Sequence, residues 1–283
     1  MMPRGWRGHP TVATDKTIVL ITGGNSGIGF EVAAQLLTDK TKHVILGSRS
    51  LEKGEAAIKD LQSRNLPGTV ELLQLDVTDP QSIEAAAKTV ESKHGRLDGL
   101  INNAAIASPT EGTPNAVLNG YMTASPENPM PLQPLADYTA MCFQANATGP
   151  LLMGEAFSPL LRKSIATPRI ISVSSGAGSI ASRLNPKGPG AAIRAPWYRA
   201  SKAAMNMVTA CQVADYGRAG FKVFAYCPGY TVSNLSAMNS AENGAKPTSQ
   251  GAKPIVRMVD GECDEWHGRF AHENGDELGE YGW

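Results

Sequence analysis

Short apolar runs alternate with longer stretches of helical periodicity along the first hundred residues. The runs predicted as strands are TIVLIT (17–22), HVILGS (43–48), TVELLQL (69–75) and LDGLINNA (97–104). Helices are predicted between them, over residues 27–37, 51–63 and 80–94. Because the strands are apolar throughout and alternate with helices, they imply right-handed crossovers and a parallel sheet covered on both faces.

The second half of the chain repeats this alternation. The elements predicted there are a helix over 137–161, a strand over RIISVSS (169–175), a helix from Pro196, and strands over FKVFAYC (221–227) and GRFAHENG (268–275). Two segments rich in Pro, Gly, Asn and Ser, 108–135 and 176–196, are expected to be loop insertions. We expect an α/β fold: one Rossmann-type domain over 16–283, with about seven strands and helices on both faces of the sheet, after a flexible tail (1–15).

Composition narrows the class of partner. The chain has 26 basic and 26 acidic residues, so no overall charge favours nucleic acid or an anionic membrane, and a small-molecule partner is expected. No run of about 18 apolar residues predicts a membrane span, and the N-terminus lacks an apolar signal core. The four cysteines lack metal-ligand spacing, so we expect reduced thiols, a cytoplasmic protein and no metal site.

A glycine-rich turn, ITGGNSGIGFEV, joins the first predicted strand to the first predicted helix. Glycines at 23, 27 and 29 permit positive φ and bring backbone N–H groups and the helix N-terminus close to an anion. A pyrophosphate is the expected ligand, although such glycines can also serve the turn alone.

The spacing of these glycines is the TGxxxGxG form, which resembles the short-chain dehydrogenase/reductase family. TGGNSGIGFEVAAQLL and GRFAHENG further resemble its carbonyl-reductase branch, as does the interval of 23 positions between Ser175 and Tyr198. The resemblance implies a nicotinamide cofactor. The turn residues that it assigns to cofactor binding are Gly23, Asn25, Ser26, Gly27, Ile28 and Gly29.

The end of the second strand, GSRS, indicates which nicotinamide cofactor to expect. Ser48 and Arg49 stand where an acidic residue would accept hydrogen bonds from the ribose of NAD. A guanidinium pairs with a 2′-phosphate, so NADP(H) is predicted, unless Arg49 is only a solvated surface residue. The resemblance assigns further cofactor contacts to residues after later strands, namely Asp76, Val77, Asn103, Pro228, Gly229, Thr231 and Ser233.

The stretch PWYRASKAAMNMV places Tyr198 and Lys202 one helical turn apart on the same face. An ordinary amphipathic helix, with the aromatic ring inward and the lysine outward, is the alternative. By resemblance the two residues form the YxxxK pair, which also contacts the cofactor, and Ser175 and Asn146 complete the catalytic group.

The resemblance gives each of these four residues a role. Tyr198 would donate a proton to a carbonyl oxygen held by Ser175. Lys202 would lower the pKa of the Tyr198 phenol and bind the ribose, while Asn146 would position a water. Two alternatives stay open: the neighbouring Ser174 in place of Ser175, and a cap or bend of the helix at Asn146.

The sequence indicates the class of substrate but not its identity. Large side chains near the expected cleft suggest a bulky apolar or aromatic ketone or aldehyde, although they fit a core equally well; they are Trp197, Met205, Tyr230 and Met238. Residues 236–249 are expected to form a lid, and the assembly to be a monomer or homodimer. Two other functions remain as alternatives, a non-redox cyclase or isomerase and a nucleotide-binding regulatory protein.

Overall fold

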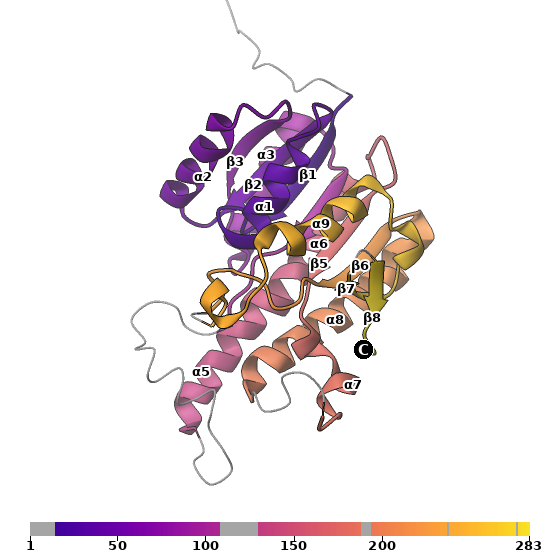
Figure 1. Cartoon of the computed structure of the whole chain (residues 1–283). Helices are drawn as coiled ribbons and strands as arrows, with labels where there is room; N and C mark the ends of the chain where they lie inside the picture. The colour runs from indigo at the N-terminus through magenta and orange to yellow at the C-terminus, as the bar shows by residue number, and fades with distance from the viewer. Residues whose placement is uncertain (1–14, 108–129, 188–193, 237, 276) are drawn as a thin grey trace, which may run out of the picture.

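The computed structural model describes residues 15–107, 130–187, 194–236, 238–275 and 277–283. An eight-stranded sheet with the order β3-β2-β1-β4-β5-β6-β7-β8 forms its centre (Figure 1). Neighbouring strands are parallel from β3 to β7, and β8 pairs antiparallel with β7. The strands are β1 (Thr17–Thr22), β2 (Lys42–Ser48), β3 (Thr69–Gln74), β4 (Gly99–Asn102), β5 (Arg169–Val173), β6 (Lys222–Cys227), β7 (Phe270–Asn274) and β8 (Glu277–Glu280).

Helices cover both faces of this sheet. Val19 and Ile21 of β1 belong to a core shared with α1, α2 and α9, whereas Ile18 and Leu20 belong to a core shared with α3, α6 and α8. The helices are α1 (Gly27–Leu36), α2 (Leu51–Ser63), α3 (Pro80–His94), α5 (Leu132–Phe143), α6 (Gly149–Leu161), α7 (Ile180–Arg183), α8 (Pro196–Tyr216) and α9 (Thr248–Asp260). The predicted single-domain, doubly wound α/β fold is therefore confirmed.

The structure corrects several predicted boundaries. The helix predicted over 137–161 starts earlier, as α5, and a π-helix (Gln144–Thr148) separates α5 from α6. The prediction of about seven strands missed β8, whose sequence ELGE carries no apolar run. The prediction also missed α9, although α9 begins within the segment expected to be a lid.

The predicted tail and loop insertions lie partly outside the described residues. Residues 1–14, 108–129 and 188–193 are not among the described ranges. The described ends of the two insertions include the start of α5 and the short helix α7. Within the described part of the chain, no helix combines the length and apolar character needed to cross a membrane.

Candidate active site

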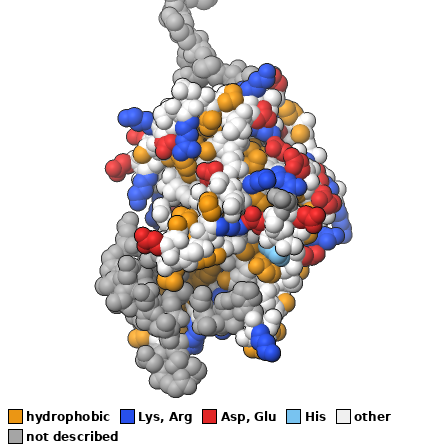
Figure 2. Space-filling model, in the orientation of Figure 1, with side chains coloured by type: hydrophobic (Ala, Val, Ile, Leu, Met, Phe, Trp, Pro, Cys, Tyr) orange, Lys and Arg blue, Asp and Glu red, His pale blue; other side chains and the backbone are white. Residues whose placement is uncertain are grey.

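A cavity of about 1270 Å³ opens where the loops after β1, β4, β5 and β6 meet. Ligand sites in open parallel sheets lie at this carboxyl edge of the strands. All predicted cofactor and catalytic residues line the cavity except Gly29 and Asn146. Acidic and basic side chains are interspersed on the face of the molecule seen in Figure 2, which agrees with the balanced composition.

The glycine turn has the conformation that its sequence predicts. Gly23 and Gly27 have φ of +62° and +56°, in the left-handed region that L side chains rarely adopt. A Cβ atom on Gly29 would lie 2.4 Å from the Asn103 amide nitrogen. The turn therefore needs glycine at these positions, and α1 begins at Gly27 with its first N–H groups at the cavity.

Asn103 fixes this turn to the end of β4. Its side-chain amide donates to the carbonyl oxygens of Thr22 (2.9 Å) and Gly23 (3.1 Å). Asp76, which lines another side of the cavity, accepts hydrogen bonds from the backbone N–H and the hydroxyl of Thr78. Both residues therefore order the loops that form the cavity wall.

Arg49 lies at the end of β2, exposed, and lines the cavity. The preceding Ser48 hydroxyl donates to the Ser50 carbonyl (2.8 Å), so it serves the turn between β2 and α2. Among the described residues, no carboxylate forms an ion pair with Arg49. The guanidinium is thus available to an anionic ligand.

Tyr198 and Ser175 meet in the cavity from two different elements. Tyr198 lies in the first turn of α8, whereas Ser175 follows β5 and caps a short 3-10 helix by accepting from the Ala177 N–H (3.2 Å). Both hydroxyl groups line the same cavity. Burial raises the pKa of Tyr198 above its ordinary value, and the nearby Ser175 hydroxyl opposes this shift only in part.

Lys202 is buried beneath Tyr198. Its Nζ donates to the Val173 carbonyl (2.8 Å) and lies 6.0 Å from the centroid of the Tyr198 ring. Burial lowers the pKa of Lys202 to about 8. The pKa of Tyr198 is raised overall because desolvation of the phenol is the largest influence on it, whereas the lowering by Lys202 stays a prediction.

The structure distinguishes the two neighbouring serines. The Ser174 hydroxyl is buried and donates to the Asn206 side-chain oxygen at 2.5 Å, so it is used in packing α8 against β5. The Ser175 hydroxyl instead accepts from the Ala177 N–H and lines the cavity with Tyr198. This geometry favours Ser175 as the residue that contacts a ligand.

Asn146 lies in the π-helix, behind the cavity lining. Its side-chain oxygen accepts from the Ile106 N–H (2.9 Å), and its amide donates to the Ile106 carbonyl (2.8 Å) and the Ser201 hydroxyl (3.0 Å). The side chain is therefore committed to holding the loop after β4 against α8. The predicted water contact remains untested.

Two residues that the sequence did not indicate also line the cavity. The Cys227 sulfur accepts from the backbone N–H groups of Gly176 (3.0 Å) and Gly229 (3.4 Å), and Tyr281 lines the same cavity. Cys227 thereby joins the Ser175 loop to the Pro228–Gly229 loop. Tyr281 is distant in sequence and has no surrounding motif.

The remaining predicted residues divide between wall and core. The Thr231 hydroxyl donates to the Pro228 carbonyl (2.8 Å) and so orders the loop after β6, which also carries Ser233. Trp197, Tyr230 and Met238 line the cavity, as predicted. Met205 does not line it and is fully buried, so the core interpretation is correct for that residue.

Comparisons with known proteins show the family to which the chain belongs. A profile of the family described as short chain dehydrogenase matches residues 17–244. The short-chain dehydrogenase anuI of Penicillium roqueforti is 34% identical over 96% of this chain and 99% of its own length. A (+)-neomenthol dehydrogenase of Arabidopsis thaliana is 30% identical over 85% of this chain and 90% of its own length.

A solved structure shows the same likeness in three dimensions. The NADPH-bound carbonyl reductase from chicken fatty liver superposes with a TM-score of 0.72 and is 26% identical, covering 91% of this chain and 96% of its own. The chain belongs to the short-chain dehydrogenase/reductase family of oxidoreductases, which use a nicotinamide cofactor.

Proposed function

We propose that this protein is an NADPH-dependent carbonyl reductase that converts a bulky apolar or aromatic ketone or aldehyde to an alcohol, with Tyr198 as the proton donor. The observation that carries the proposal is that Ser175 and Tyr198 line one cavity together with Lys202 and the glycine turn. The cavity therefore combines hydrogen-bond donors for a carbonyl oxygen with a glycine turn suited to bind a dinucleotide.

The residues present fit NADPH. The left-handed Gly23 and Gly27, and the close contact that a side chain at Gly29 would make with Asn103, suit a backbone that approaches a pyrophosphate. Arg49, which has no ion pair in the described part of the chain, suits the additional 2′-phosphate. When bound, NADPH supplies the hydride.

The catalytic residues act on the oxygen of the substrate carbonyl. Ser175 and Tyr198 each donate a hydrogen bond to that oxygen as negative charge develops on it, and Tyr198 transfers its proton. The raised pKa of Tyr198 keeps the phenol protonated at neutral pH, ready to act as an acid. Lys202, whose Nζ lies 6.0 Å from the centroid of the Tyr198 ring, stabilises the phenolate that remains.

The cavity wall supports the substrate class. Tyr230 and Met238 are exposed and line the cavity, and Trp197 lines it from a buried cluster. Aromatic and thioether side chains bind apolar or aromatic groups by burial and stacking. Two relatives carry names that agree with a carbonyl or secondary-alcohol substrate, a carbonyl reductase and a neomenthol dehydrogenase.

We also propose a cytoplasmic location and a monomeric or dimeric state. The four cysteines are all free thiols, in agreement with a reducing compartment. Light scattering of the purified protein measures the oligomeric state directly, and a tetramer would contradict this part of the proposal.

The function is tested with a panel of ketones, aldehydes and quinones of increasing size. We expect NADPH to be consumed only when a carbonyl compound is present, with the highest kcat/KM for bulky aromatic substrates and an equal amount of alcohol formed. A cyclase or isomerase would convert its substrate without consuming NADPH. A regulatory protein would bind NADPH without turnover, so either result would contradict the proposal.

The choice of cofactor is tested by Arg49→Asp. Because the substitution removes a guanidinium and adds a charge that repels the 2′-phosphate, we expect kcat/KM for NADPH to fall at least tenfold more than that for NADH. Arg218→Asp, which changes an exposed arginine outside the cavity lining, is the control and should preserve the preference. Equal losses with both cofactors in Arg49→Asp would remove this role for Arg49.

A further inference from the structure

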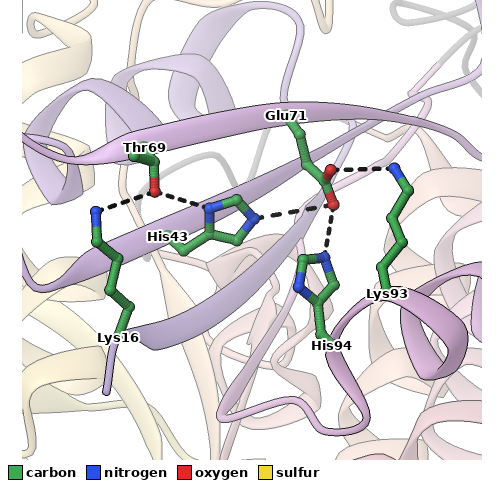
Figure 3. A network of polar contacts seen from close by, with 6 residues as sticks. All are labelled: Lys16, His43, Thr69, Glu71, Lys93 and His94. Atoms are coloured by element: carbon green, nitrogen blue, oxygen red, sulfur yellow. Dashed lines mark hydrogen bonds and ion pairs between the residues drawn. The ribbon is translucent and has the colours of Figure 1, made fainter. Parts of the chain in front are cut away.

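A second cluster of polar side chains lies at the opposite end of the sheet from the active site. His43 belongs to the start of β2, Glu71 to β3, and His94 is the last residue of α3. Figure 3 shows the two imidazole rings turned toward the same carboxylate. The amino ends of β2 and β3 and the C-terminus of α3 place these side chains together, so the cluster is separate from the cavity already described.

The donor atoms converge closely. Nε2 of His94 lies 2.7 Å from Oε1 of Glu71, Nε2 of His43 lies 3.8 Å from the same oxygen, and one donor atom from each residue lies within 4.8 Å of the other two. A tetrahedral Zn²⁺ with bonds near 2.0 Å holds its ligand atoms about 3.3 Å apart. Small side-chain rotations therefore suffice to pass from the observed spacing to a metal-binding one.

Burial sets this cluster apart from an ordinary surface ion pair. The His43 and His94 side chains are only 5% and 1% exposed. His43 Nε2, which faces Glu71, and His94 Nδ1 have no hydrogen-bond partner among the described residues. Buried polar atoms without partners are rare, and a cation between the two rings would give His43 Nε2 a partner.

Neighbouring residues hold the imidazole rings and the carboxylate of this cluster in place. His43 Nδ1 lies 2.8 Å from the Thr69 hydroxyl, which also accepts from Lys16, so the Nε2 atom is left to point inward. Lys93 donates to Oε2 of Glu71, which leaves Oε1 facing the histidines. Such contacts to the outer atoms of metal ligands orient them.

Charge restricts the kind of ion. The cluster has a single carboxylate and two nearby lysines, which disfavours Mg²⁺ or Ca²⁺ because these ions bind through several oxygen ligands. Imidazole nitrogen instead favours Zn²⁺, and two histidines with one glutamate form a known zinc ligand set. The C-terminus of α3 adds a partial negative charge beside His94.

We infer that His43, Glu71 and His94 form a binding site for one Zn²⁺ ion, which ties β2, β3 and α3 together. The fourth ligand is water, because the Glu71 side chain is 26% exposed and opens the cluster to solvent. Binding at His94 Nε2 requires its ring proton to move to Nδ1. The site lies outside the catalytic cavity, and its role is structural.

The inference is tested by titrating the chelator-treated, full-length protein with Zn²⁺ in a calorimeter. We expect one Zn²⁺ per chain and a rise in melting temperature with zinc. Glu71→Gln and His94→Gln should each weaken binding at least tenfold. Glu91→Gln, which removes an exposed carboxylate from the same helix, is the matched control and should bind as the wild type does.

Co²⁺ provides a second readout that depends on the identity of the ligands. A nitrogen and oxygen site gives visible d–d absorption without a thiolate charge-transfer band, whereas binding at the exposed Cys211 would produce that band. Melting curves recorded with chelator show whether each variant is folded. Absence of binding by the wild type, unchanged binding by a folded Glu71→Gln variant, or a thiolate band would each overturn the inference.

Discussion

At the scale of single residues, burial determines the chemistry of the candidate active site. It raises the pKa of the Tyr198 phenol and lowers the pKa of the Lys202 ammonium to about 8, so it disfavours the charged form of both. The sequence predicted which residues meet, because the spacing of Tyr198 and Lys202 fixes their common face. It did not predict the direction of the Tyr198 shift, which depends on how completely residues distant in sequence exclude water.

The pH dependence of reduction follows from Lys202. Its folded-state pKa lies below the ordinary 10.5, so the ammonium loses its proton as the pH rises through about 8, while Tyr198 stays protonated. Because the proposed mechanism uses the protonated lysine, kcat/KM should be constant below this pH and fall tenfold per unit above it. A pH profile of ketone reduction measures this, and a flat profile to about pH 10 would contradict the assignment.

The two neighbouring serines provide a matched pair of substitutions. Ser175→Ala removes a donor to the carbonyl oxygen and should lower kcat by about 10²–10³ without changing NADPH affinity. Ser174→Ala leaves the buried Asn206 oxygen unpaired and should lower the free energy of unfolding by about 1–3 kcal/mol, with kcat largely kept. Steady-state kinetics and urea unfolding distinguish the two, and the reverse pattern would assign catalysis to Ser174.

At the scale of helices and strands, the sequence predicted the elements whose burial leaves a periodic pattern. The predicted bounds of α2, α3 and β1 agree with the structure. Strand β1 could be predicted because its residues are apolar toward both faces of the sheet. Helix α9 was missed because Gly251 and Pro254 interrupt its sequence. Packing on α1 and the sheet stabilises α9 despite its low helix propensity.

Asp98, which directly precedes β4, joins three of these elements. Its carboxylate accepts from the Ile18 N–H of β1 (2.8 Å) and from the Ser164 hydroxyl after α6 (2.7 Å), and it lies 3.5 Å from Arg96. Asp98→Ala leaves the buried Ile18 N–H and the partly buried Ser164 and Arg96 without this acceptor, so urea unfolding should show a loss of about 3–5 kcal/mol. Asp60→Ala breaks only an exposed pair and should cost under about 1 kcal/mol; equal losses would contradict this role.

At the scale of the whole molecule, the two ends of the sheet carry different clusters of polar residues. The carboxyl end gathers loops from along the chain into the catalytic cavity, whereas the amino end brings His43, Glu71 and His94 together. The candidate catalytic residues could be proposed from the sequence because they lie in recognisable local motifs. Tyr281 and the histidine cluster could not be, since only tertiary packing places residues so distant in sequence side by side.

The central claim is that Tyr198 delivers the proton to a carbonyl beside a bound nicotinamide, and Tyr198→Phe tests it most directly. The substitution removes a single hydroxyl and preserves the ring that packs in the cavity. We predict that kcat for ketone reduction falls by at least 10²–10⁴ while the Kd for NADPH, measured by fluorescence quenching, changes less than about threefold. Retention of wild-type kcat by a folded Tyr198→Phe variant would contradict the account.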